Sequence, residues 1–481
     1  MAEFTLSGTT LRERTTTATD DPRLRASLAK AVARFADGRA DALGALDDPD
    51  ALRSAARRIR HEIVERLPDV LERFADNAMA AGVHIHWAVD GADANAYIVD
   101  VARRIGARNV VKGKSMATEE TALNDALEAA GCHVVETDLG EWIIQLAHQT
   151  PSHIIAPAVH LDRFQIRDIL QPVAGPDRPL DTEPEKLAAF AREKLRVEFL
   201  QADLGISGCN FAVAETGSIV LVENEGNGRL STTAPRVHIA LMGLERIVET
   251  WEQLDLFINL LARSGTGQHL STYTNILTGP RRTTGDAVEG DGPDEMHVVI
   301  LDNGRSAILG TEFAEVANCI RCGACLNVCP VYRQVGGHAY GWVYSGPIGA
   351  VLTPLLAGEQ PEAAELANAS TLCGACMDAC PVSIPLQDLL LALRRKKAAD
   401  AGVAERSGWH AWSAAWKRPL TYRASMKAIA VGRPLARFSH LAPGLRNWAD
   451  GRNPPMPAAH SFTERWNAGE MTPGRGRERG R

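Results

Sequence analysis

A repeated spacing of cysteines constrains this chain more than any other feature. The pattern C-x2-C-x2-C-x3-C-P occurs twice, 51 residues apart, with serine in place of the first cysteine of the second copy. The first copy consists of Cys319, Cys322, Cys325 and Cys329. The second copy consists of Ser370, Cys373, Cys376 and Cys380. Together they hold seven of the nine cysteines, and such clustered thiols usually bind metal or perform redox chemistry in proteins of the cytosol.

This spacing is the one with which bacterial two-cluster ferredoxins hold iron–sulfur clusters. Small residues after the second cysteine of each copy, Gly323 and Gly374, allow the backbone to approach a cluster closely. In ferredoxins the fourth cysteine of each run reaches the other cluster. The pattern therefore assigns one 4Fe–4S cluster to Cys319, Cys322, Cys325 and Cys380. It assigns the second cluster to Cys329, Cys373 and Cys376, with Ser370 at the fourth position.

Ser370 leaves the composition of the second cluster open. The cluster could be 3Fe–4S, or 4Fe–4S with a serine oxygen, water or a partner's group on the fourth iron. Structural zinc is the other explanation of C-x-x-C pairs, but zinc takes four ligands, and seven thiols in a crossed frame fit it poorly. We therefore predict a brown iron–sulfur protein. The remaining cysteines, Cys132 and Cys209, lie beside apolar segments and are interpreted as small buried hydrophobes.

The rest of the chain reads as helices followed by an α/β domain. Residues 21–80 place apolar side chains at helical spacing. Between about 82 and 300, short β-branched runs alternate with helical stretches, which predicts a largely parallel sheet. The runs that we expect to be strands include GVHIHWAV, NVVKGKS, CHVVETD and SHIIAPAV. The expected divisions are a helical region (1–68), an α/β domain (69–302), a mostly α-helical ferredoxin-type domain (303–400) and a basic C-terminal region (401–481).

Length and charge add two constraints. A chain of 481 residues suggests about three domains, and no apolar run approaches the roughly 20 residues that span a bilayer. Because no secretory h-region follows Met1, we expect a cytoplasmic protein. The net charge of −7 divides into +12 for residues 391–481 and −19 for the remainder.

The basic end of the chain also holds five of the nine tryptophans. Trp409, Trp412 and Trp416 are spaced to form one face of a helix. Docking on the chain's own core or on a partner subunit is the favoured interpretation. Peripheral contact with the inner face of the membrane is an alternative. Nucleic acid is not an expected partner, since no recognised DNA- or RNA-binding module accompanies the charge.

Two segments of the α/β domain are candidates for a ligand pocket. Lys112 and Lys114 lie between a predicted strand and a predicted helix, where a phosphate group could bind, although this segment is also a plausible helix start. The second group contains carboxylates, an amide and a cation at strand ends, and tight turns would explain it equally. Its members are Glu215, Asn224, Glu225 and Arg229. No G-x-G-x-x-G follows a strand, so a nicotinamide- or flavin-binding fold has no support.

Several segments resemble the lactate-utilization iron–sulfur protein family. They include KGKSMATEETALNDALEAAG, GISGCNFAVAETGSIVLVENEG and CIRCGACLNVCPVYRQVGGHAYGWVYSG, and the likeness spans roughly residues 60–400. The resemblance implies an LUD domain, similar to the NagB/RpiA/CoA-transferase-like α/β fold, followed by a two-cluster ferredoxin module. It also implies L-lactate oxidation to pyruvate beside a Cys-rich subunit similar to heterodisulfide reductases and a smaller LUD protein. It supplies no catalytic residue for the LUD domain.

Three hypotheses for function follow. The leading one is an iron–sulfur electron-transfer subunit of a lactate-oxidising complex, because lactate oxidation releases two electrons and iron–sulfur clusters accept electrons singly. In the enzyme alternative the LUD domain itself binds and oxidises lactate or another 2-hydroxy acid, with Glu215, Glu225 or Arg229 orienting it. A redox-sensing regulator is the third, and the lack of a DNA-binding module argues against it.

Overall fold

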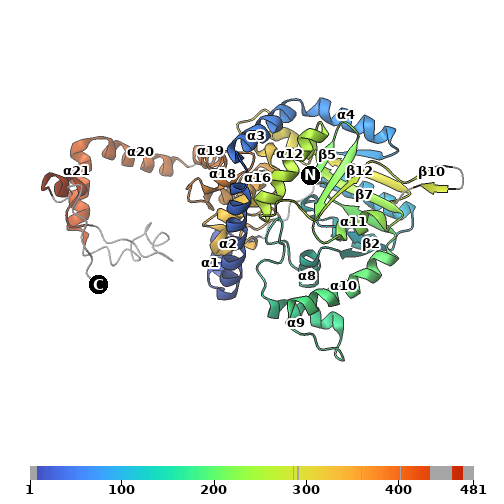
Figure 1. Cartoon of the computed structure of the whole chain (residues 1–481). Helices are drawn as coiled ribbons and strands as arrows, with labels where there is room; N and C mark the ends of the chain where they lie inside the picture. Colours follow the sequence, from blue (N-terminus) through green and yellow to red (C-terminus); the bar gives the residue numbers. More distant parts are fainter. Residues whose placement is uncertain are drawn as a thin grey trace. The chain divides into compact units, whose positions relative to one another are not determined.

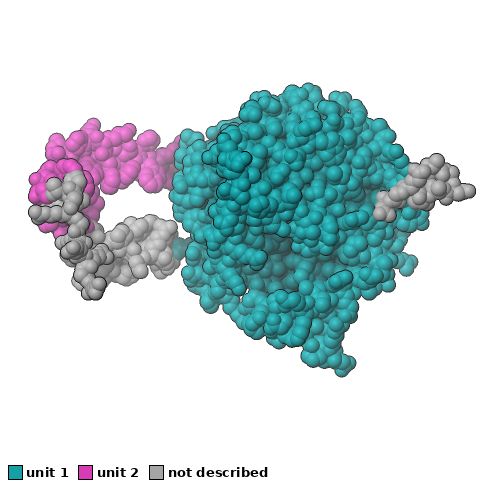
Figure 2. All heavy atoms as spheres, viewed as in Figure 1, with its two compact units in different colours: residues 1–396 teal, residues 397–481 magenta. Residues whose placement is uncertain are grey.

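The computed structural model describes residues 8–284, 287–289, 292–358, 360–400, 402–433 and 458–469. It divides into two compact units, residues 1–396 and residues 397–481 (Figure 2). The first unit contains both the α/β domain and the two cysteine motifs, whose buried side chains share one continuous hydrophobic core.

A six-stranded parallel sheet forms the centre of the α/β domain, in the order β1-β12-β7-β4-β2-β3. Strands β1 to β3 confirm three of the predicted runs. The carboxyl ends of β2, β4 and β7 lie side by side, which is where ligands bind in open parallel sheets. The strand bounds are β1 His84–Ala88, β2 Asn109–Lys112, β3 His133–Glu136, β4 Leu204–Ser207, β7 Val237–Gly243 and β12 Glu295–Leu301.

Helices cover both faces of this sheet (Figure 1). Alternate residues of a strand point to opposite faces, so Val299 of β12 packs in one core with α5 and α7, while Val298 packs in the core shared with the cysteine region. A third core joins the β2–β3 edge to α8, α9 and α10. The helix bounds are α5 Gly91–Arg104, α6 Met116–Glu120, α7 Leu123–Ala129, α8 Leu139–Leu146, α9 Arg163–Ala174, α10 Pro184–Gln201 and α11 Asn227–Thr233.

A second, four-stranded sheet has the order β8-β5-β6-β9. The β5–β6 turn needs glycine, because Gly217 has φ +68° and a Cβ there would lie 2.1 Å from the backbone nitrogen of Ala78. This sheet is packed by α4 and α12, and a small hairpin of β10 and β11 precedes β12. The bounds are β5 Phe211–Val213, β6 Ser218–Glu223, β8 Ile247–Val248, α12 Trp251–Gly265, β9 Tyr273–Leu277, β10 Arg282–Thr284, β11 Ala287–Glu289 and α13 Arg305–Ile308.

The predicted N-terminal helices are present. Helix α2 packs against helices of the cysteine region, some 300 positions later in the chain, as well as against α12. The side chain of Arg14 donates from Nε to the carbonyl of Ala339, 2.9 Å away, and fixes α1 on the same region. The bounds are α1 Leu11–Thr19, α2 Pro22–Gly44, α3 Pro49–Glu65 and α4 Leu67–Ala80.

The cysteine region consists of short helices, and the helix of the first motif, α14, packs against that of the second, α18. This confirms the predicted mostly α-helical domain. The bounds are η1 Ala314–Asn318, α14 Ala324–Val328, α15 Tyr332–Val335, η2 His338–Tyr340, α16 Gly346–Leu356, α17 Pro361–Ala364, η3 Glu365–Asn368, α18 Ala375–Ala379 and α19 Leu386–Ala399.

One predicted strand is wrong. SHIIAPAV, residues 152–159, forms bends and turns although its first residues are buried. Its polar groups face the cysteine region: the Ser152 carbonyl accepts a hydrogen bond from the Tyr332 hydroxyl at 2.7 Å, and His153 Nε2 lies 3.1 Å from Asn327 Oδ1. Because these groups bond across the domain junction, the β-branched run does not join a sheet.

The second unit contains three described helices, α20 Val403–Lys417, α21 Pro419–Val431 and α23 Phe462–Asn467. Trp409, Trp412 and Trp416 lie along α20 with successive ring centroids 5.8 and 5.0 Å apart, which confirms the predicted helical face. All three side chains are exposed within this unit.

Candidate functional site: two cysteine sets and an adjoining cavity

Four cysteines line one small cavity in the main core. Three come from the first motif, Cys319, Cys322 and Cys325, and the fourth is Cys380 from the end of the second motif. Apolar side chains, including Ile154 of the α/β domain, complete the lining. Cysteines more than 50 residues apart in the sequence therefore line the same cavity, and they are the four that the ferredoxin pattern assigns to the first cluster.

The two motifs have the same local backbone. The residue before the second cysteine is left-handed in both, with φ +59° at Arg321 and +55° at Leu372. The glycine after that cysteine is left-handed too, with φ +77° at Gly323 and +86° at Gly374, and a five-residue helix follows in each motif. Left-handed backbone at a non-glycine residue is strained and concentrates at functional sites. The repeat in the sequence is thus also a repeat in three dimensions.

Main-chain N–H groups donate to sulfur in these motifs. Three such N–H···S distances are 3.4 Å: from Arg321 to Cys319 Sγ, from Tyr332 to Cys329 Sγ and from Ile384 to Cys380 Sγ. In the second motif the N–H of Leu372 donates to Ser370 Oγ at 3.1 Å, the same two-residue offset as Arg321 to Cys319. Ser370 therefore presents its oxygen where the first motif presents a sulfur.

The electrostatic neighbours of the thiols show the same two sets. Burial raises the pKa of Cys325 most, and nearby thiols raise it further. Those thiols belong to Cys319, Cys322, Cys380 and Cys376. Burial and then the nearby Cys329 raise the pKa of Cys376 to about 12, and Cys373 contributes as well. Cys376 also acts on Cys325, in line with the packing of α14 against α18, which brings the two sets together.

The residues present fit iron–sulfur clusters. Burial and the repulsion between neighbouring thiolates raise the pKa of the buried thiols, so these thiols keep their protons. Metal binding replaces the protons with iron, whose positive charge stabilises the thiolates. The left-handed glycines allow close backbone approach, and the N–H groups aimed at sulfur are the second-layer contacts that tune such clusters.

The surroundings of the two sets differ. Three arginines contact the first: Arg321 lies inside the motif, Arg246 donates to the Cys319 carbonyl at 3.4 Å, and Arg53 donates to the Cys380 carbonyl at 2.9 Å. At the second set the buried Tyr340 lies near Cys329, Arg394 donates to the Ser370 carbonyl at 2.7 Å, and Cys373 is exposed. Hydrogen bonds from the Thr371 side chain and then the Ala375 main chain lower the pKa of Cys373.

Helix α3 holds the first set through a row of arginines that the sequence analysis did not single out. Arg53 donates to the carbonyl of Cys380, the last cysteine of the second motif, and Arg57 donates to that of Ser383, three residues later. Arg60 is fully buried and donates to the carbonyls of Glu245, Ile247 and Ala317 at 2.7 to 2.8 Å. The sequence did contain a signal for this row, because the three arginines are spaced four and three residues apart and so share one face of an amphipathic helix with buried apolar residues.

A larger cavity of about 260 Å³ opens beside Cys322. It lies at the carboxyl ends of β2, β4 and β7, and its lining comes from both the α/β domain and the cysteine region. Lys114, Asn224 and Glu225, three of the predicted pocket residues, line it. Its wall also includes Arg321 and Tyr344 from the cysteine region.

Ion pairs organise the inner wall of this cavity. Glu245 pairs with Arg305 at 2.9 Å and with Arg321 at 3.0 Å. Burial alone would raise the pKa of Glu245. The positive charges nearby, of Arg305 first and then of Arg321 and Arg246, outweigh burial and lower this pKa to about 2. Arg305 also forms a bidentate pair with the buried Glu120. These residues were not predicted, because each is unremarkable until the fold brings it to the junction.

The other three predicted pocket residues lie outside this lining. Glu215 is an exposed turn residue whose carboxylate accepts from the Trp251 main chain at 3.3 Å. Arg229 lines a separate surface cavity that also includes Arg282. Lys112 is fully buried behind the strand end.

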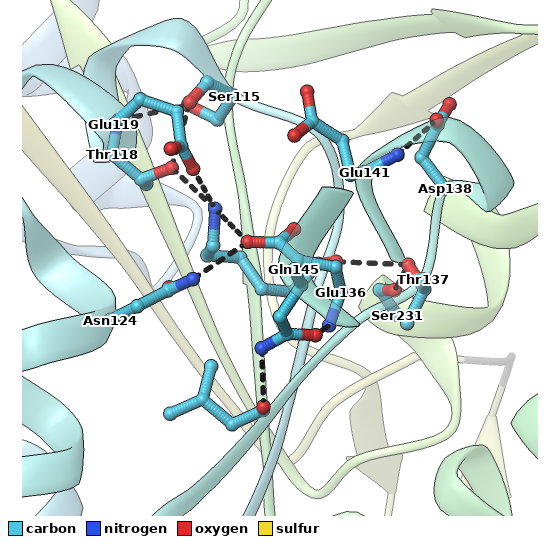
Figure 3. Close-up of polar contacts among 12 residues, drawn as sticks. Ser115, Thr118, Glu119, Asn124, Glu136, Thr137, Asp138, Glu141, Gln145 and Ser231 are labelled. Atoms are coloured by element: carbon cyan, nitrogen blue, oxygen red, sulfur yellow. Dashed lines mark hydrogen bonds and ion pairs between the residues drawn. The ribbon is translucent and has the colours of Figure 1, made fainter. Parts of the chain in front are cut away.

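Lys112 belongs to a buried polar cluster, and its partners Thr118, Glu119 and Glu136 are labelled in Figure 3. The Lys112 ammonium lies 2.9 Å from Thr118 Oγ1, 2.9 Å from Glu119 and 2.6 Å from Glu136. Burial raises the pKa of Glu136 to about 7, although the neighbouring ammonium opposes this. All three ammonium donors are engaged, so Lys112 ties β2 to β3 and α6 within the protein.

The two remaining cysteines differ from each other. Cys132 is buried in the core beneath α7, as predicted. Cys209 is only partly buried and lines the 260 Å³ cavity, where burial raises the pKa of its thiol to about 12.

Family models match three successive parts of the chain. Residues 71–301 match the LUD domain, residues 315–384 match the 4Fe-4S dicluster domain, and residues 392–470 match the model described as lactate utilisation protein B, C-terminal. The fold is thus an α/β LUD domain followed by a helical iron–sulfur domain.

Curated relatives match nearly the whole chain. Lactate utilization protein B of Shouchella clausii is 46% identical over 459 residues, covering 93% of this chain and 94% of the relative. The protein of the same name from Bacillus subtilis is 44% identical and covers 97% and 98%. The chain belongs to the lactate utilization protein B family. A further member, from Geobacillus kaustophilus, is 48% identical over 86% of this chain and 87% of the relative.

Membership of this family makes the chain a lactate-utilization iron–sulfur protein, and the dicluster match supports iron–sulfur clusters in the cysteine region. Along the described part of the chain, no helix combines the length and apolar character needed to cross a bilayer.

Proposed function

We propose that the chain is the electron-transfer subunit of a complex that oxidises L-lactate to pyruvate. The observation that carries this proposal is the packing of α14, the helix of the first motif, against α18, the helix of the second, which places both cysteine sets in one core. A pair of adjoining redox centres provides a path for electrons that leave a two-electron donor one at a time.

The first set, Cys319, Cys322, Cys325 and Cys380, would hold a 4Fe–4S cluster. The second, Cys329, Cys373 and Cys376, would hold a 4Fe–4S or 3Fe–4S cluster with Ser370 at the fourth position. When bound, these clusters supply one-electron redox chemistry. The chain's own contribution is to bury the first set, to place cations beside it and to donate main-chain N–H groups to sulfur.

The proposed partners are a Cys-rich subunit similar to heterodisulfide reductases and a smaller LUD protein. The tryptophan face of α20 supports docking, because Trp409 and Trp412 expose 62% and 50% of their surface in a helix with basic neighbours. Aromatic side chains are enriched at protein interfaces. The membrane alternative rests on the same face, and lipid-vesicle sedimentation of the full chain with and without its partners separates the two.

The test is an anaerobic assay of lactate oxidation with an artificial electron acceptor. The isolated holoprotein should form no pyruvate, while the complex reconstituted from co-purified subunits should form it and reduce the clusters of this chain. Steady pyruvate formation by the isolated chain would contradict the proposal and place the oxidation within this chain.

A further inference from the structure

The 260 Å³ cavity joins the ligand-binding edge of the LUD sheet to the cysteine region. Lys114 and Ser207 line it from the ends of β2 and β4, and Cys322 lines it from the first cysteine set. A molecule in this cavity would therefore contact both the strand ends and a residue that is proposed to hold a cluster.

The acidic side chains of this cavity are largely engaged within the protein. Glu245 is held between two arginines, and Glu223 accepts from the main-chain nitrogens of Gly228 and Arg229 at the start of α11. Asp138 accepts from two main-chain nitrogens at the start of α8. Glu225 accepts from the main-chain nitrogen of Asn224 at 3.2 Å. These carboxylates already have donors and do not call for a cationic ligand.

The cations of the same wall are less fully used. Arg321 places its guanidinium 4.7 Å from the Tyr344 ring centroid and gives one nitrogen, Nη2, to Glu245. Its Nη1 is buried and has no hydrogen-bond acceptor among the residues that the structure describes. Lys114 donates to the Ile155 carbonyl at 3.1 Å and lies 3.6 Å from Asp138, which leaves one of its three ammonium donors for a ligand, and 27% of its side chain is accessible. A buried guanidinium N–H without an acceptor is costly, so this donor points to an acceptor supplied by a ligand.

We propose that this cavity binds a small organic carboxylate, a 2-hydroxy or 2-oxo acid. Arg321 and Lys114 would donate to the carboxylate, because charge-assisted hydrogen bonds from guanidinium and ammonium groups suit that ligand. A volume of about 260 Å³ admits an acid of a few heavy atoms and lies just below the usual range for larger ligands. This inference rests on the proposed function for the identity of the acid.

The cavity differs from the pocket that the sequence suggested. Arg229 lies in the lining of another cavity and Glu215 on an exposed turn, so neither lines this one. The new assignment depends on Arg321, a residue inside the cysteine motif that only the folded chain brings to the LUD sheet.

The test is isothermal titration of the anaerobic holoprotein, full-length, with pyruvate and with L-lactate. Lys114→Gln should weaken binding about tenfold or more through loss of one charge-assisted hydrogen bond, and Arg321→Gln should do the same. Lys186→Gln, the same change on the exposed side of α10, should leave binding unchanged. Acid binding should also alter the EPR spectrum of the first cluster, since Cys322 lines the cavity.

Absence of binding by wild type at tens of millimolar acid would overturn the inference. So would equal affinities of wild type and Lys114→Gln, a variant outside the cysteine motif that does not depend on cluster assembly. Loss of binding in Arg229→Gln but not in Lys114→Gln would overturn the inference and move the site to the surface cavity that Arg229 lines. The proposed function is tested separately: clusters reduced by the complex in a chain that binds no acid would refute only this inference.

Discussion

The first and second cysteine motifs have nearly the same backbone but different surroundings. Both place left-handed residues around the second cysteine and begin a short helix after it. The first, however, contains Arg321 where the second has Leu372, and its Cys319 carbonyl accepts from Arg246. The second exposes Cys373 and has Ser370 in place of a cysteine, and arginines reach it only at the carbonyls of Asp378, Cys380 and Ser370 among the described residues.

This difference separates the features that both motifs need in order to bind a cluster from those that give each cluster its own reduction potential. The shared backbone is what any cluster of this type needs, since it brings N–H groups to sulfur. The unshared features, charge and solvent exposure, are those that set reduction potential. We therefore expect cations to raise the potential of the first cluster, because positive charge stabilises the more negative, reduced state.

The largest expected effect comes from exchanging the fourth cysteine of each motif. If the ligands cross, Cys380→Ser removes the first cluster although Cys380 lies in the second motif, and Cys329→Ser damages the second cluster. Each variant should retain about half of the wild-type iron. Iron and sulfide determination with EPR measures this, and Cys132→Ser, outside both sets, is the control. Retention of the first cluster in Cys380→Ser would show that each motif binds its own cluster.

Removal of the buried carboxylate beside the first motif should have the next largest effect. Glu245→Gln leaves Arg305 and Arg321 without their shared partner, which should lower the free energy of unfolding by about 3 kcal/mol at pH 7. Denaturant unfolding measures it. The exposed Glu72→Gln should change stability by less than about 0.5 kcal/mol.

The same carboxylate gives a pH dependence of definite sign. Its pKa is held at about 2, below the ordinary 4.5, so its stabilisation is complete above pH 4.5 and is lost as pH falls towards 2. The difference in stability between wild type and Glu245→Gln should therefore shrink over that interval. A difference that stays constant from pH 5 to pH 3 would contradict the ion-pair explanation.

A smaller effect is expected from the cation inside the first motif. Arg321→Gln should lower the potential of the first cluster by roughly 60 mV, equivalent to about 1.4 kcal/mol for one electron, and leave the second unchanged. EPR-monitored redox titration measures both. The control is Leu372→Gln, at the matching position of the second motif. It removes no charge and should shift neither potential. Equal shifts of both clusters in Arg321→Gln would show that the arginine acts through the fold rather than locally.

The smallest expected change restores the missing thiol. Ser370 already presents its oxygen in the position of a sulfur, so Ser370→Cys should be accommodated without loss of stability. If the second cluster is 3Fe–4S, the variant gains about one iron, and Mössbauer spectroscopy detects it. Loss of the second cluster in Ser370→Cys would show that this position does not face it.

Local patterns predicted much of this structure. The cysteine spacing indicated a two-cluster module because its ligands are fixed by short-range geometry, and alternating β-branched runs located β1 to β3. Residues 152–159 misled the same reasoning, because their polar groups bond to the cysteine region rather than to a neighbouring strand.

The cavity wall was predicted only in part. Lys114, Asn224 and Glu225 follow strands, so their place at the sheet edge could be foreseen. Glu245 and Arg321 meet only because two domains pack together, and no spacing in the sequence records that contact.

The central claim is that one chain holds two adjoining clusters in unequal surroundings. An EPR-monitored redox titration of the anaerobic full-length protein tests it most directly. We predict two one-electron transitions. The same transition should disappear in Cys380→Ser and shift in Arg321→Gln, because both residues belong to the first cluster's surroundings. A single transition, or a colourless protein that contains zinc, would contradict the account.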